Sequence, residues 1–122
     1  MRGANEMQDA LRDVTDREII QLAKHFASQQ PRPTSGALDK SLFNRGAAAA
    51  KKLRCGICHL ADFSGQNQMP RLASQREDYL RETMTAFRDQ PRAGGDTIMS
   101  DALRGVSDKD LAALAHFLSR SR

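Results

Sequence analysis

The segment Cys55-Gly56-Ile57-Cys58-His59 constrains this chain more than any other feature. Cys-x-x-Cys-His is the pattern for covalent attachment of a c-type haem. Two thiols three positions apart can each form a thioether to one haem vinyl group, and the adjacent imidazole then reaches the iron from the same side. Iron in such proteins takes a proximal His, and often a Met on the far side, which raises the reduction potential. The motif therefore predicts a chain that folds around a porphyrin.

Other chemistries of paired cysteines fit these residues less well. A redox dithiol of the thioredoxin kind expects a strand–helix context, and no strand-like alternation flanks Cys55. Zinc usually takes four ligands from two such pairs, whereas this chain has two cysteines, and His25 and His116 are not at ligand spacing. A structural disulfide between Cys55 and Cys58 is the simplest remaining alternative. The adjacent His59 favours haem over all three.

Composition agrees with a core that a cofactor completes. The 122 residues suffice for one small domain and some extra length, but only 5% are aromatic and none is Trp. A buried porphyrin would supply the missing apolar area. The formal net charge of +4 favours acidic partner proteins or anionic membrane surfaces. Nucleic acid is not indicated, because no basic cluster is interleaved with aromatic residues.

The second informative feature is an internal repeat. Residues 7–28 align with residues 99–120 at a constant offset of 92 positions. Nine of these 22 positions are identical, where average residue usage would give about one or two by chance. The first copy begins at Met7 and the second at Met99. The two copies therefore predict the same local structure on either side of the haem motif.

Each copy predicts a capped amphipathic helix. Thr15-x-x-Glu18 and Ser107-x-x-Asp110 match capping boxes, in which a hydroxyl and an acid satisfy free N–H groups at a helix start. The first of these helices is expected to stop near Gln30, before Pro31. Apolar residues recur at helical spacing in both copies, at Ile19, Leu22, Ala23, Phe26, Leu111, Leu114, Ala115 and Leu118.

Two more helices are predicted between the copies, and no strand is convincing. One spans roughly residues 38–53, and its Gly46 would let another helix cross closely. The other spans about residues 74–88. Residues 62–71 are rich in turn formers, and the Gly-rich stretch 90–98 is expected to form a loop that leads to Met99. The apolar stripes consist of Leu42, Phe43, Gly46, Ala49, Ala50 and Leu53 on the first helix and Leu80, Met84 and Phe87 on the second.

From Leu42 to Leu118 the chain resembles the class I c-type cytochromes, most closely the C-terminal domain of a dihaem cytochrome of the c-four type. Residues 69–75, Met-Pro-Arg-Leu-Ala-Ser-Gln, are similar to the family's Pro-Arg-Leu-Ala-Gly-Gln segment. Two residues depart from the family's pattern. Leu60, directly after the haem motif, and Ser74, within this segment, both stand where the family commonly has Gly. The remaining motifs are Phe43-x-x-Gly46, Cys55-x-x-Cys58-His59, Tyr79-Leu80, Phe87-Arg88, and Met99 before the capped C-terminal helix.

The resemblance implies an all-α fold, with three main helices around one covalently bound haem c. Its N- and C-terminal helices are expected to cross over the haem. Residues 38–122 would form this monohaem domain, and residues 31–37 a linker. Residues 1–30 would be the tail of a preceding cytochrome domain whose own haem motif is absent. The alternative is an unrelated amphipathic N-terminal helix, which nine identities in register make less favoured.

His59 is the proximal iron ligand by adjacency, and the resemblance places the distal ligand at Met99. The alternatives are Met7, Met69, Met84 and His116. The neighbours of Met69 match a segment that passes the proximal side. Met84 lies on an inward helix face, where Met is usually core packing. We expect His116 to be a surface residue or a helix-crossing contact.

Four more haem-binding residues are implied by the resemblance. Pro70 would offer its backbone carbonyl to the proximal His N–H, a bond that fixes the ring and tunes the iron. Arg92 would pair with a haem propionate, although a solvated loop Arg is the alternative. For Tyr79 core packing is the default expectation, and a contact in the same region is what the resemblance adds. Leu72 lies in the matched segment beside Pro70.

These residues predict an electron-transfer protein and not an enzyme, because both axial positions of the iron would be filled. One alternative is a haem enzyme or small-ligand-binding protein with an open or labile sixth site, of the peroxidase type. Another is a structural module of a larger redox complex. The sequence holds no acid–base pair near Met99 that would favour the enzyme.

The expected partners are redox proteins with acidic surfaces. Covalent attachment through this motif requires export in bacteria, as cytochromes of this kind imply, so a periplasmic location is expected. No signal peptide or transmembrane segment is recognisable, and no apolar run approaches about 20 residues, so we read the numbering as that of a mature or trimmed product. An orphaned amphipathic face on residues 1–30 also predicts association, either with this chain's own haem domain or as a homodimer. A sharper variant places Met7 on the iron of a second copy by segment exchange.

Overall fold

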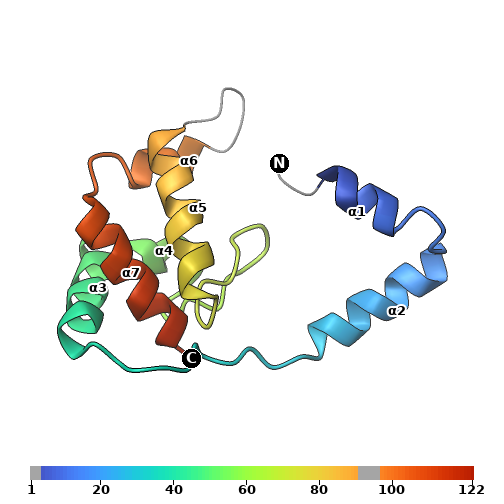
Figure 1. The fold of residues 1–122 in the computed structure, drawn as a ribbon, viewed down its shortest axis with the longest axis horizontal. Helices are drawn as coiled ribbons and strands as arrows, with labels where there is room; N and C mark the ends of the chain where they lie inside the picture. The colour runs from blue at the N-terminus through green and yellow to red at the C-terminus, as the bar shows by residue number, and fades with distance from the viewer. Residues whose placement is uncertain (1–3, 91–96) are drawn as a thin grey trace. The chain divides into compact units, whose positions relative to one another are not determined.

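The computed structural model describes residues 4–90 and 97–122, and the chain divides into the units Met1–Gln30 and Pro31–Arg122 (Figure 1). The regular elements of the described residues are all helices, with one isolated bridge between Gln66 and Met69 and no strand. This confirms the all-α prediction. The first unit holds α1 (Ala4–Ala10) and α2 (Asp16–Ala27), and the second holds α3 (Lys40–Lys52), α4 (Cys55–His59), α5 (Glu77–Asp89), α6 (Thr97–Ala102) and α7 (Asp108–Arg120).

Helix α7 is the centre of the second unit and packs against both α3 and α5 (Figure 1). Ser107 caps α7, since its side chain accepts a hydrogen bond from the N–H of Asp110, as the capping-box pattern predicted. The four residues predicted as its apolar face are all buried. Together with residues of α3, α5 and the chain after α6 they form one hydrophobic core: Ala50, Leu80, Met84, Leu103, Leu111, Leu114, Ala115 and Leu118.

Gly46 is where α3 crosses α7. A Cβ atom on Gly46 would lie 2.1 Å from the carbonyl oxygen of Ala113 and 2.6 Å from the Cβ of Phe117. Only a residue without a side chain permits this approach. The Phe117 ring packs edge-to-face against Phe43 of α3 and against Phe63 in the loop after α4, at centroid distances of 5.0 and 5.6 Å.

We therefore expect Gly46→Ala to destabilise the protein by roughly 2–3 kcal/mol, the upper range for overpacking a close contact. Ala normally favours a helix over Gly by about 1 kcal/mol, so the sign would be reversed. Denaturant unfolding of the haem-loaded protein measures this loss. Ala48→Ser at an exposed site of the same helix is the control and should stay within about 0.5 kcal/mol. An unchanged or raised stability for Gly46→Ala would contradict the crossing.

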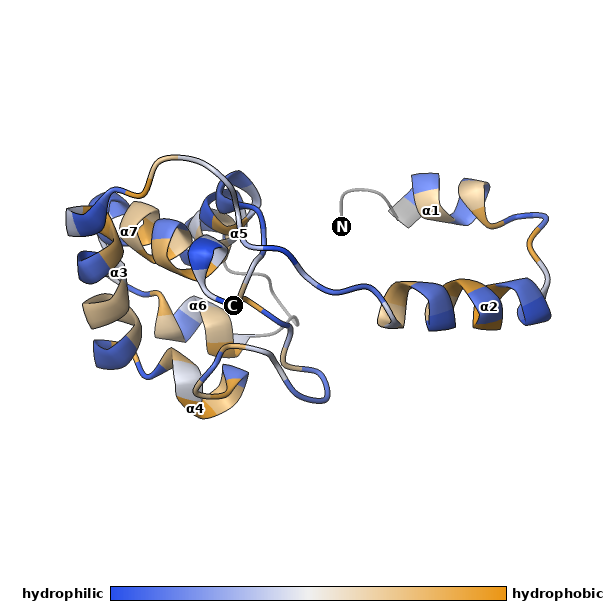
Figure 2. Ribbon diagram, turned by 90° about the horizontal axis from the view of Figure 1, so that it is seen from below, coloured by the Kyte–Doolittle hydropathy of each residue, from blue (hydrophilic) through white to orange (hydrophobic). Residues whose placement is uncertain are grey.

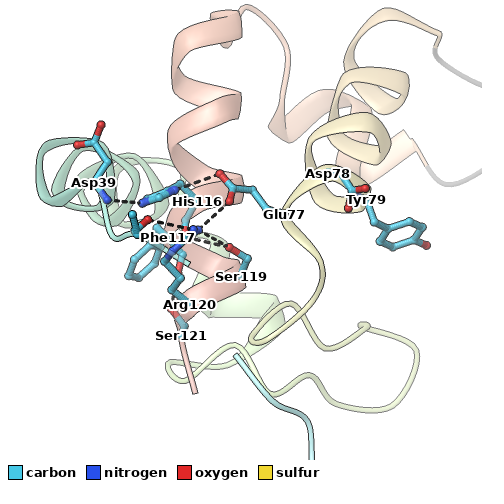
Figure 3. Close-up of polar contacts among 10 residues, drawn as sticks. Asp39, Glu77, Asp78, Tyr79, His116, Phe117, Ser119, Arg120 and Ser121 are labelled. Atoms are coloured by element: carbon cyan, nitrogen blue, oxygen red, sulfur yellow. Dashed lines mark hydrogen bonds and ion pairs between the residues drawn. The ribbon is translucent and has the colours of Figure 1, made fainter. Parts of the chain in front are cut away.

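The side chain of His116 joins three elements (Figure 3). It is 4% exposed, and its Nε2 accepts a hydrogen bond from the backbone N–H of Asp39 at 3.1 Å. An accepting Nε2 requires the proton on Nδ1, which lies 3.1 Å from Oε1 of Glu77. His116 is thus a buried helix-crossing contact between α7, α5 and the start of α3, and the alternative of a surface residue is wrong.

Glu77 is the acidic partner in this group. Its other carboxylate oxygen accepts a hydrogen bond from Nη1 of Arg120 at 2.7 Å (Figure 3). Burial by itself would raise the pKa of Glu77, but the hydrogen bonds from Arg120 and His116 outweigh it and hold the pKa below its usual value. Arg120 also donates to the carbonyl of Ala37, and the N–H of Thr34 donates to the carbonyl of Ser119. The predicted linker is therefore held along the end of α7.

Three helix boundaries differ from the predicted ones. The helix predicted from residue 38 starts at Lys40, because Asp39 caps it by accepting a bond from the N–H of Leu42. The helix predicted from residue 74 starts at Glu77, since the backbone of Ser74 has a φ of +66°, which no α-helix accepts. The first capped helix ends at Ala27 rather than near Gln30, where the Ser28 hydroxyl bonds the carbonyl of His25.

The first unit repeats the hydrogen bonds of the second. The N–H of Leu11 donates to the carbonyl of Met7 at 3.0 Å, as the N–H of Leu103 does to Met99 at 3.0 Å. Thr15 caps α2 with a complete capping box, and α2 and α7 begin 92 residues apart at equivalent aspartates. The sequence repeat is thus also a repeat of local structure.

The apolar face of α2 is exposed in this structure, unlike its counterpart on α7. Figure 2 shows hydrophobic residues recurring along α2, and the helix has no buried residue. The exposed large residues of α2 are Ile19, Ile20, Leu22 and Phe26.

Among the described residues, no helix is long and apolar enough to cross a membrane.

Candidate haem site

The haem motif forms helix α4, a single five-residue turn of helix. Two residues with left-handed backbone bound it, Arg54 with φ of +59° and Leu60 with φ of +72°. Such residues stop a helix because their backbone cannot continue it. The isolated turn places Cys55, Cys58 and His59 on one short segment between α3 and the following loop, an element that the periodicity of the sequence did not predict.

His59 is held in one orientation. It is 4% exposed, and its Nδ1 lies 2.8 Å from the carbonyl oxygen of Pro70. A carbonyl can only accept, so Nδ1 carries the proton and Nε2 is left with its lone pair for a metal. This is the contact that the resemblance implied for Pro70, and such a bond sets both the tautomer and the ring plane of a ligating His.

The loop after α4 brings Pro70 back to His59. The N–H of Gly65 donates to the carbonyl of His59 at 3.0 Å, and the side chain of Gln66 donates to the carbonyl of Cys58 at 3.1 Å. Gln66 and Met69 then exchange two backbone hydrogen bonds, at 3.0 and 2.7 Å, which closes a tight turn. The start of the loop is thus bonded to the backbone of Cys58 and His59, and the end of the loop supplies the Pro70 carbonyl that orients the His59 ring.

The two cysteines do not form a disulfide with each other. Burial raises the pKa of the Cys55 thiol, which disfavours the thiolate that a reactive dithiol needs. Within the described part of the chain, no three or more His, Cys, Asp or Glu side chains are grouped to hold a metal ion, so the four-ligand set of structural zinc is not formed there. Two thiols and an oriented imidazole on one turn fit a covalently bound haem c, and Cys55 and Cys58 attach it.

Met99 lies in helix α6, not at the end of a loop as predicted. Residues 97 and 98 are already helical, and Met99 is partly buried against the hydrophobic core. Its backbone carbonyl accepts from the N–H of Leu103, a residue only 3% exposed. A short helix anchored by Leu103 holds the Met backbone more rigidly than an irregular loop would.

The other methionine alternatives lie in different settings. Met84 is buried in the core on α5, as predicted. Met69 sits in the tight turn that leads into Pro70, on the His59 side. His116 has both ring nitrogens within hydrogen-bond distance of protein groups. Of the methionines in Pro31–Arg122, Met99 lies outside both the buried α5 position and the turn beside Pro70, and it stays the predicted ligand for the far side of the iron.

The remaining predicted haem-binding residues differ in how far they are buried. Leu72 packs against the core, and its N–H donates to the carbonyl of Phe63 at 2.9 Å. Tyr79 is 55% exposed on α5 and turns away from the His116 group (Figure 3), so the default expectation of core packing is wrong. Arg92 lies outside the described residues.

The two departures from the family's glycines both fall at strained backbone. Leu60 has φ of +72° and ψ of +159°, a region that is essentially reserved for Gly. Ser74 has φ of +66°, but its hydroxyl donates to the carbonyl of Ser121 at 2.7 Å and offers some compensation. The common Gly at these positions therefore has a conformational reason, and this chain carries the strain.

This strain predicts an inverted order of stability at position 60. Leu60→Gly should be more stable than Leu60→Ala by about 1–2 kcal/mol, because both lose the side chain but only Gly adopts this backbone freely. Thermal unfolding of both variants measures the difference. At the control position, exposed Ala48 of α3, Gly should instead cost about 1 kcal/mol relative to Ala. Equal stability of the two Leu60 variants would show that the turn relaxes without strain.

Comparison with known proteins points the same way. The family model described as Cytochrome c matches residues 43–121. Cytochrome c4 of Thiocapsa roseopersicina is 33% identical over 96% of this chain and 66% of its own length. Cytochrome c4 of Azotobacter vinelandii is 31% identical over 93% of this chain and 58% of its own length. The crystal structure of reduced cytochrome c4 from Pseudomonas stutzeri superposes with a TM-score of 0.75, at 28% identity, over 96% of this chain and 66% of that one.

These matches reach beyond the haem domain at the N-terminal side. The family model begins at residue 43. The cytochromes c4 align with almost the whole chain, so residues before 43 contribute to the likeness. The chain nevertheless spans only about 58–66% of the length of these relatives.

Proposed function

The chain belongs to the cytochrome c family, and from that membership we propose that it carries single electrons between redox proteins through a haem c ligated by His59 and Met99. The buried His59, whose Nδ1 is held by the Pro70 carbonyl, carries this proposal. When bound, the haem supplies one-electron chemistry, and the protein tunes its potential.

The residues of the chain would act on that potential in three ways. The Pro70 carbonyl makes His59 a stronger donor. The thioether of Met99 favours the reduced iron and raises the potential. The apolar core residues Leu80, Met84 and Leu103 lower the local dielectric, which also disfavours the more highly charged oxidised state.

The absorption spectrum of the oxidised protein tests this function. We expect a weak band at the red end of the spectrum that reports Met–iron coordination, and no change on adding cyanide or azide within minutes. Rapid, tight binding of either anion, with turnover of hydrogen peroxide, would instead establish the open-site alternative.

We also propose that the protein works in the periplasm with acidic redox partners. Covalent attachment through Cys55 and Cys58 is a reaction of the exported side of the bacterial membrane in cytochromes of this kind. The net charge of +4 favours encounter with acidic surfaces. A steep fall of the electron-transfer rate with ionic strength would support this, and a salt-independent rate would contradict it.

We propose that residues 1–30 are the C-terminal segment of a preceding cytochrome domain, joined by residues 31–37 to the haem domain of residues 38–122. The hydrogen bonds shared by Met7–Leu11 and Met99–Leu103 support this origin. So does the exposed face of α2, because the equivalent face of α7 is covered by α3 and α5. An α2 separated from such helices leaves an apolar surface that associates.

The isolated chain should therefore form homodimers through α2. Fully burying each large side chain is worth roughly 1.5–3 kcal/mol, so Ile19→Ser with Phe26→Ser should weaken self-association by at least about tenfold and leave the haem spectrum unchanged. Sedimentation at several concentrations measures this. Leu38→Ser, an equally exposed apolar site outside α2, is the control. A strict monomer at high concentration before any substitution would contradict association.

Exchange of the repeated segments between two copies is disfavoured by the packing of α7. Gln21 would take the place of Ala113, which is fully buried where Gly46 crosses. Lys24 would take the place of His116 and leave a cation in a buried site.

A further inference from the structure

Arg88 at the end of α5 joins three parts of the haem domain. Its Nη1 donates to the backbone carbonyl of Val106 at 2.9 Å. Nη2 pairs with Asp108, the first residue of α7, at 2.7 Å, and Nε and Nη2 bind both carboxylate oxygens of Asp89 at 2.6 and 2.9 Å. The Arg88 side chain is only 17% exposed, whereas the carboxylates of Asp89 and Asp108 that it binds face solvent.

The carbonyl of Val106 is the end of a hydrogen-bonded path to Met99. The N–H of Val106 donates to the carbonyl of Leu103 at 3.1 Å, and the N–H of Leu103 donates to the carbonyl of Met99 at 3.0 Å. Leu103 is buried in the core. Arg88 therefore reaches the backbone of Met99 through two residues, and each step is a direct hydrogen bond.

We propose that Arg88 is a positioning residue for the axial methionine, holding the segment that carries Met99 against the end of α5. This inference rests on the proposed function, in which Met99 ligates the iron. Arg88 and Val106 lie 18 residues apart, and Met99 lies between them. The contact limits how far residues 97–106 can move from the end of α5, so the methionine sulfur would stay within reach of the iron even when its bond breaks transiently.

The guanidinium is suited to this task because it donates in several directions at once. One plane serves a carbonyl and two carboxylates, which a single ammonium group cannot do with the same geometry. Arg104, in contrast, pairs with Asp101 in its own turn, at 2.5 Å, and its side chain is 80% exposed. Arg104 therefore offers a matched control, an Arg near Met99 that ties nothing to α5.

The test uses the full haem-loaded chain with Arg88→Ala, Arg88→Lys or Arg104→Ala. Cyanide binding to the oxidised protein is limited by release of the methionine, so its rate should rise about tenfold or more in Arg88→Ala. The red band should weaken and the reduction potential should fall. Arg88→Lys should give an intermediate rate, and Arg104→Ala should remain within about twofold of the unmodified protein.

Gly46→Ala separates positioning from general loss of stability, because it destabilises the α3–α7 crossing without touching the Arg88 contacts. A faster cyanide reaction in Arg88→Ala than in Gly46→Ala, at comparable unfolding midpoints, supports the inference. A red band in the unmodified protein together with unchanged rates in both Arg88 variants overturns the inference alone. Absence of that band from the unmodified protein overturns the proposed function and the inference with it. If Arg88→Ala does not fold, Arg88→Lys decides between these outcomes.

Discussion

Replacing Met99 with alanine is expected to leave the haem covalently attached while opening the sixth coordination position of the iron. The thioether favours the ferrous state, so its loss should lower the reduction potential on the order of 0.1 V or more, a fraction of the roughly 0.8 V over which axial ligands tune haem iron. The red absorption band should disappear, and cyanide should bind without delay. Spectra and redox titration of the purified variant measure all three effects.

Met84→Ala is the matched control for this experiment. Met84 is buried in the core on α5, so its truncation should cost about 2–5 kcal/mol of stability and yet retain the red band. An unchanged spectrum and potential in Met99→Ala would show that another residue is the ligand. Met69 and Met7 would then be substituted in turn, whereas His116 is engaged by Asp39 and Glu77.

Substituting both Cys55 and Cys58 by alanine is expected to abolish covalent haem and most of the helical structure with it. The buried core of the haem domain is small, with only ten apolar residues buried among those described. A domain of this size has little stability to spare, and the porphyrin supplies packing area that several aromatic side chains would otherwise provide. Far-ultraviolet circular dichroism and a haem stain of the denatured protein measure the two losses.

Ile57→Ala is the control for this second experiment, since Ile57 lies between the two cysteines but is 68% exposed. It should retain covalent haem and nearly all helical content. A double cysteine variant that folds with native helical content would show that the side chains alone build the core, and that the haem is an addition to it.

The sequence predicted most of what depends on neighbouring residues. The capping box at Thr15 is complete, and Ser107 caps α7 at the residue that the pattern indicated, because a cap is a contact over three positions. The spacing of Leu111, Leu114 and Leu118 predicted the face of α7 that is buried. Gly46 was predicted as a crossing point, and its reason in the structure is the carbonyl of Ala113.

Contacts between residues far apart in the sequence could not be predicted from local spacing. His116 could not be placed, because its partners Asp39 and Glu77 lie 77 and 39 residues away. The α6 helix around Met99 was predicted as loop, since a six-residue segment next to glycines has no helical periodicity of its own. Phe87-Arg88 was one of the motifs that carried the family resemblance, but nothing in the sequence gave Arg88 a role, because its partner Val106 lies 18 residues away.

The order of the residues alone was enough to predict the chemistry of this chain and the repeat within it. Two thiols and an imidazole at fixed spacing define what can be attached, and nine identities in register define the copied unit. The orientation and support of the predicted ligands, in contrast, depend on the folded chain. The Pro70 carbonyl reaches His59 through a folded loop, and Arg88 reaches the Met99 segment across 18 residues. Such contacts depend on where the packing of α3, α5 and α7 places the backbone, which local spacing does not encode.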